Sequence, residues 1–154
     1  MTMRLPAHLA MLGDAERSLA LTHRAVTSEH AADADVVLAC ARFARQCDER
    51  AQAVDAFAAE RYPLKGETFN PLVAPDFGRA EGDSIGLLRD LAALHQFATR
   101  VQVTWEHVEQ AGHGLHDRGL IALASRGFGD LDVQVKWVKH RMKNEAAQAL
   151  IATG

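Results

Sequence analysis

Three polar residues interrupt an apolar stripe near the N-terminus, and their side chains offer the clearest chemistry in this sequence. Glu16, His23 and His30 fall in a series of positions separated alternately by four and three residues, which is the spacing of one face of an α-helix. The whole series is Leu5, Leu9, Leu12, Glu16, Leu19, His23, Val26 and His30. A carboxylate on such a face needs a metal ion, a basic partner or a proton, because burying it alone as a charge costs several kcal/mol.

Metal binding is the first chemistry that these residues predict. If the first helix runs up and the second and third run down, Glu16 and His23 lie at the same height as Asp48 on the second helix and His95 on the third. Cys47 lies beside Asp48 at that level. Carboxylate and imidazole ligands together suit iron or another divalent transition metal. We therefore take Glu16, His23, Asp48 and His95 as the candidate ligands, with the absence of any cofactor as an equally plausible alternative.

An ion pair is the second chemistry. Arg50, on the second helix, faces the first helix and is a candidate partner for Glu16. In this alternative the histidines are hydrogen-bonded interior residues, and His30 interacts with the dipole at a helix C-terminus. His113, His116 and Asp117 lie among glycines, which is typical of a solvated bend. The residues alone leave both alternatives open, and they indicate no catalytic set.

Several other kinds of site have no signature in the sequence. There is no Cys-x-x-Cys motif, no nucleophile paired with a base and no glycine loop of the phosphate-binding kind. Cys40 and Cys47 stand seven residues apart on one expected helix, a backbone separation of about 10 Å that is too long for a disulfide. We expect both to be reduced, buried thiols in a cytoplasmic protein. The net charge of −3 and the lack of a basic stripe or a long apolar run argue against nucleic-acid and membrane partners.

The apolar spacing predicts four helices in one domain covering residues 1–154. The first two are expected over residues 5–31 and 35–61, followed by an irregular crossover over residues 62–83 that holds three of the four prolines. The third helix should start near Ser84 and continue to at least Gly112, or as far as Ser125. A turn is expected at residues 126–129, and a last helix over residues 130–149 with Asp130 as its N-cap.

Short, long and short connections are typical of a four-helix bundle with one crossover. The chain resembles the ferritin-like superfamily in this architecture. Residues 86–91 (GLLRDL), Trp137 and residues 146–150 (AAQAL) are also similar to segments of small, uncharacterised bacterial ferritin-like proteins. The resemblance implies a ferritin-like all-α fold. Its usual di-iron pattern needs Glu-x-x-His on two helices, and this sequence contains no Glu-x-x-His.

Two functions follow as expectations. The first is a ferritin-like protein with a degenerate or absent metal site, or, if the ligands are intact, one that binds or oxidises iron. The second is a metal-free oligomeric interaction module. The third helix carries apolar residues on more than one face, including Leu88, Phe97 and Val103, and such an excess predicts a homodimer. No small-molecule ligand is indicated.

Overall fold

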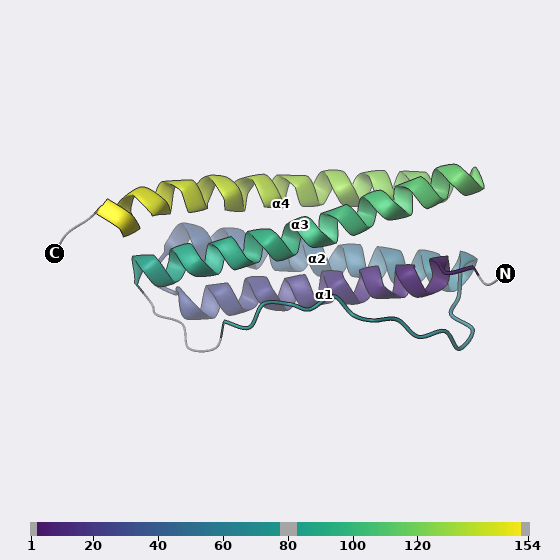
Figure 1. Cartoon of the computed structure of the whole chain (residues 1–154), viewed down its shortest axis with the longest axis horizontal. Coiled ribbons are helices and arrows are strands. Elements are labelled where there is room, and N and C mark those ends of the chain that lie inside the picture. The colour runs from purple at the N-terminus through teal and green to yellow at the C-terminus, as the bar shows by residue number, and fades with distance from the viewer. Residues whose placement is uncertain (1–2, 78–82, 152–154) are drawn as a thin grey trace.

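The computed structural model describes residues 3–77 and 83–151, and this part of the chain contains four helices and no strand. The helices are α1 (Leu5–Glu29), α2 (Ala34–Arg61), α3 (Ser84–Leu115) and α4 (Arg118–Ile151). They lie lengthwise beside one another as a bundle (Figure 1). The predicted all-α, four-helix bundle with a long crossover between the second and third helices is therefore confirmed.

The crossover sets the directions of the helices. It runs the length of the bundle after α2, so that α3 starts at the end where α2 also starts and runs parallel to it, while α1 and α4 run the opposite way (Figure 1). α1 packs closely on α2, and α3 packs closely on α4. Between these two pairs, α1 packs against α3, and α2 makes a looser contact with α4.

The inward face of α1 is the one that the spacing predicts. Each of the eight positions of the stripe from Leu5 to His30 is buried, including Glu16 and His23. The cysteine prediction is also confirmed, because Cys40 and Cys47 are free thiols buried in α2. At the start of α2, Val36 is fully buried and Val37 is partly exposed.

The described part of the crossover covers a second face of the bundle. Leu72, Ala74 and Phe77 pack against the core, and Phe97 of α3 is only 4% exposed. The crossover thus covers part of the apolar excess on α3 from which we predicted a dimer. Val103 of α3 remains 40% exposed, and the homodimer stays a prediction that needs other support. Positions 78–82 of the predicted crossover lie outside the described residues.

The turn between the last two helices lies earlier than predicted. α3 ends at Leu115, His116 adopts a left-handed conformation (φ 52°), and the Asp117 side chain accepts a hydrogen bond from the backbone N–H of Leu120 at 3.1 Å. The prediction of a turn at residues 126–129 is wrong, as is the assignment of Asp130 as an N-cap, because α4 continues through both. Gly127 serves close packing instead: a Cβ atom there would lie 2.5 Å from the Trp105 ring.

Within the described chain, none of the helices combines the length and the apolar character that crossing a membrane requires.

Candidate functional site

A buried layer of polar side chains crosses the middle of the bundle and takes one member from each helix. The members are Glu16 of α1, Arg50 of α2, Trp105 of α3 and Gln134 of α4. Glu16 is 0% exposed and Arg50 is 7% exposed. Since polar groups at this depth are stable only when they bond one another, the layer links all four helices.

The centre of the layer is an ion pair. The Arg50 guanidinium binds Glu16 side-on, with Nε donating to Oε2 and Nη2 donating to Oε1 at 3.2 Å. The Trp105 indole also donates to Glu16 Oε2, at 3.2 Å. Both carboxylate oxygens are therefore occupied by N–H donors, an arrangement that fits the ionised form.

The outer side of the guanidinium is satisfied as well. Arg50 Nη2 donates to Cys47 Sγ at 3.2 Å. With the Gln134 amide oriented so that its oxygen faces Arg50, that oxygen accepts from Nη1 and Nη2 at 3.2 Å each. The side-chain amides of Gln46 and Gln134 lie 3.0 Å apart. The charge of Arg50 is thus held in one place by several residues.

The pKa values of the pair reflect burial opposed by attraction. Burial raises the pKa of Glu16, and the charge and hydrogen bonds of Arg50 act against that rise. Burial acts to lower the pKa of Arg50, but the attraction of Glu16 outweighs it, so the pKa of Arg50 lies above its ordinary value. Asp130 on α4 adds to the attraction. Arg50 therefore stays positively charged at the centre of the bundle.

His23 joins the layer as a neutral group. Its ring is fully buried, hydrogen-bonds with Gln134, and packs edge-on against Phe43 with ring centres 5.6 Å apart. Nδ1 has no hydrogen-bond partner among the described residues. Burial is the main reason why the pKa of His23 falls to about 3. At neutral pH the ring is uncharged.

The four candidate metal ligands do not converge. Glu16 and His23 are both buried on α1, but Asp48 lies at the surface, where it accepts a hydrogen bond from Arg24 at 2.5 Å. His95 is half-buried on α3, and burial, followed by the charge of Lys139, lowers its pKa. Across residues 3–77 and 83–151, no three His, Cys, Asp or Glu side chains form a group that could hold a metal ion.

Glu16, Arg50 and Cys47 were predicted from the sequence, whereas Trp105 and Gln134 were not predicted as polar partners. A signal for Trp105 exists in the residue type, because the N–H of a buried indole usually needs an acceptor, and a buried carboxylate supplies one. Gln134 had no comparable signal, because α4 was predicted to start only four residues before it. His30 was expected to interact with a helix dipole, but its Nε2 lies 2.6 Å from the carboxylate of Asp90 on α3.

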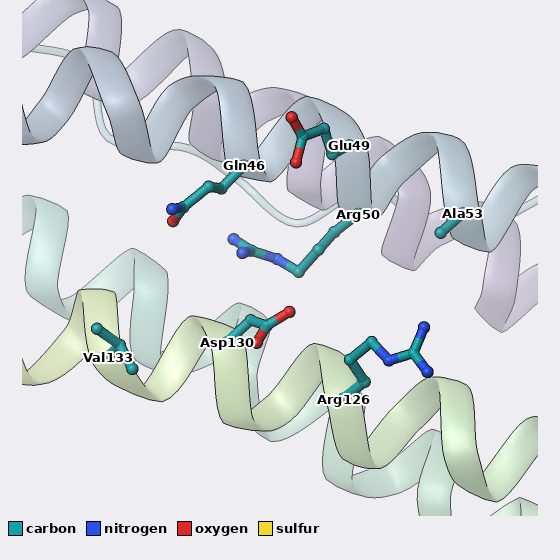
Figure 2. Close-up of a pocket in the computed structure, with 7 residues that line it drawn as sticks. All are labelled: Gln46, Glu49, Arg50, Ala53, Arg126, Asp130 and Val133. Atoms are coloured by element: carbon teal, nitrogen blue, oxygen red, sulfur yellow. The ribbon is translucent and has the colours of Figure 1, made fainter.

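A groove between α2 and α4 opens onto Arg50. It has a volume of about 410 Å³ and is lined by Gln46, Glu49, Arg50, Ala53, Arg126, Asp130 and Val133. Arg50 extends from α2 into the space between the helices, and the Asp130 side chain lies across from it on α4 (Figure 2). Glu49 and Arg126 form no ion pair with any described residue. Asp130 also forms no ion pair with a described residue, so the groove presents uncompensated charges of both signs.

Comparison of the chain with protein-family models, with curated proteins and with solved structures gave no match.

Proposed function

We propose that this chain is a ferritin-like bundle in which an ion pair takes the place of the metal centre, and that it acts as a homodimeric interaction module. The observation that carries this proposal is the Arg50 guanidinium, which lies at mid-bundle with both oxygens of Glu16 occupied. Ferritin-like di-iron proteins place inward-facing carboxylates at the corresponding level of their bundles.

A metal ion and Arg50 compete for the same carboxylate. A divalent cation bound to Glu16 would lie within a few ångströms of a guanidinium that cannot lose its proton, and like charges at that distance repel strongly in a buried site. The other candidate ligands do not offset this repulsion, because Asp48 pairs with Arg24 and His95 is not grouped with Glu16. These arguments favour the ion pair over iron binding by Glu16, His23, Asp48 and His95.

The groove between α2 and α4 is the face that suits a second copy of the chain. Two of its unpaired charges, Glu49 and Arg126, lie on facing helices. In a two-fold symmetric dimer each contact occurs twice, so Glu49 of each copy pairs with Arg126 of the other. The same two helices expose apolar side chains, with Leu38 at 74% and Val133 at 63%. Charge complementarity together with these apolar residues supports self-association through this face.

Charge exchange tests this proposal. We expect the wild-type chain to sediment as a dimer at tens of micromolar, and Glu49→Arg and Arg126→Glu each to sediment as a monomer. An equimolar mixture of the two variants should form a heterodimer, because each faces opposite charges on the other. The matched control is Arg100→Glu, an exposed residue of α3 that lies beside the crossover, which should stay dimeric. A monomeric wild type, or a dimeric Arg126→Glu, would refute the groove as the interface.

Metal analysis separates the proposal from its iron alternative. Protein purified without chelator should contain no stoichiometric iron, and it should oxidise Fe(II) no faster than buffer does. Stoichiometric iron that disappears in Glu16→Gln would instead establish the metal-binding function.

A further inference from the structure

The groove between α2 and α4 holds more charge than its own side chains neutralise. Glu49, Asp130 and Arg126 form no ion pair with any residue in the described parts of the chain. Arg50 also lines the groove, but its charge is matched by that of Glu16. The unmatched groups are therefore two carboxylates and one guanidinium, so the groove carries an excess of one negative charge.

These charged groups line one open space without filling it. The Asp130 carboxylate points from α4 toward α2, and Arg126 extends toward α2 on the side where Ala53 contributes only a methyl group (Figure 2). Arg126 and Asp130 lie one helical turn apart, a spacing at which opposite charges can pair, yet they form no ion pair with each other. A molecule lying between the helices can therefore reach both groups.

The size and lining of the groove favour a small, polar ligand. Its volume of about 410 Å³ lies within the range of small-molecule sites, about 300–1,000 Å³. Gln46 adds an amide to the charged groups, and the apolar part of the lining consists of Ala53 and Val133. A lipid or a large aromatic molecule would find little apolar surface here, whereas a compact charged molecule would find several partners.

We propose that this groove binds a free basic α-amino acid. At neutral pH such a molecule carries two positive groups and one negative group, which complements two carboxylates and one guanidinium. The carboxylate of the ligand pairs with Arg126, its α-ammonium group with Asp130 and its side-chain cation with Glu49. A guanidinium and a carboxylate can form two parallel hydrogen bonds, so the pair with Arg126 fixes the orientation of the ligand.

The ligand and a second copy of the chain compete for the same groups. In the dimer proposed above, Glu49 of each copy pairs with Arg126 of the other, so an amino acid bound to these residues excludes the partner. Binding of the amino acid does not depend on the dimer, whereas its effect on assembly rests on the proposed function. The amino acid therefore shifts the chain from dimer to monomer by mass action.

Calorimetric titration of the full chain with L-arginine tests the site. The groove is open to solvent and its ion pairs are screened, so we expect one molecule bound per chain with a dissociation constant of about 0.1–1 mM. Agmatine, which is arginine without its carboxylate, should bind about five-fold more weakly because it cannot pair with Arg126. L-Glutamate, whose net charge has the opposite sign, should not bind.

Variants of the groove test the assigned contacts. Asp130→Asn and Arg126→Gln should each weaken L-arginine binding about five-fold. Arg126→Gln should also remove the preference for L-arginine over agmatine. The matched control is Glu106→Gln, at an exposed carboxylate of α3, which should bind as the wild type does. Circular dichroism confirms that each variant is folded.

Sedimentation with and without L-arginine separates this inference from the proposed function. A dimeric wild type should become monomeric in saturating L-arginine and stay dimeric in the same concentration of L-glutamate. A monomeric wild type that binds L-arginine would refute the dimer and leave the ligand site supported. No binding of L-arginine by the wild type, unchanged affinity in Asp130→Asn, or equal binding of L-glutamate would overturn the ligand site. A dimer that persists in saturating L-arginine would overturn the competition.

Discussion

Removing each partner of the buried ion pair should give opposite responses to acid. Glu16→Gln leaves the buried Arg50 charge without its counter-ion. The guanidinium cannot become neutral by losing a proton. Breaking a buried pair from one side costs about 3–5 kcal/mol. We therefore expect Glu16→Gln to lose about 3 kcal/mol of unfolding free energy at pH 7. This value is at the lower end of the range because Arg50 borders the groove. The loss at pH 5 should be the same, because the charge of Arg50 does not change.

Arg50→Met leaves the Glu16 carboxylate without its partner, and this group can become neutral by binding a proton. Keeping a carboxyl of ordinary pKa 4.5 protonated costs about 3.4 kcal/mol at pH 7 and about 0.8 kcal/mol at pH 5. Burial raises the pKa of folded Glu16 above its unfolded value, and without Arg50 the largest opposing interaction is gone, while the hydrogen bond from Trp105 remains. Stability is then greatest below the unfolded pKa and is lost as the pH rises. Arg50→Met should accordingly lose about 3 kcal/mol at pH 7 and recover about 2.5 kcal/mol of it at pH 5.

Urea unfolding followed by circular dichroism measures both effects. Each variant is compared with the wild type at the same pH, so that the other titrating groups cancel. The double variant Glu16→Gln/Arg50→Met should lie within about 1 kcal/mol of the wild type, because it leaves no buried charge. The matched control is Arg17→Met, which breaks a half-exposed pair with Asp55 and should cost less than about 1 kcal/mol. Recovery of Glu16→Gln at pH 5, or none for Arg50→Met, would refute this reasoning.

Three further predictions concern the core. Burial lowers the pKa of His23 from 6.5 to about 3, so its contribution to stability is complete above pH 6.5 and is lost as the pH falls. Urea unfolding should show a loss of about 2 kcal/mol in unfolding free energy from pH 7 to pH 5. His23→Gln should remove this pH dependence. Gly127→Ala should lower the free energy of unfolding by about 1–3 kcal/mol, since the new Cβ would lie 2.5 Å from an indole ring. Gly129→Ala, with nothing within 4 Å, should raise it by up to about 1 kcal/mol in the same urea-unfolding assay. Cys40 and Cys47 should react slowly with a thiol reagent in native buffer and completely in denaturant, and rapid labelling of the folded chain would contradict their burial.

The position of the last turn shows why local signals were insufficient. Glycines at positions 127 and 129 are helix breakers by propensity, and on that basis a turn was predicted there. In the structure the Trp105 ring packs directly on Gly127, so the missing side chain permits close approach of α3 and α4. The actual turn depends on Asp117, which bonds the start of α4 and also Arg61 and Tyr62 at the end of α2. Contacts with α2 are remote in sequence and leave no local pattern.

The sequence by itself determined the four helices, the inward face of α1 and the irregular crossover. The reason is that burial of one helix face imposes a spacing of three and four residues, and prolines interrupt it. Only the tertiary structure decided which partner Glu16 has. The choice between a metal site and an ion pair depends on how each helix is rotated and shifted along its axis, and a single residue changes the direction of a side chain by about 100°. That rotation brings Arg50, Trp105 and Gln134 together at mid-bundle and leaves Asp48 at the surface with Arg24.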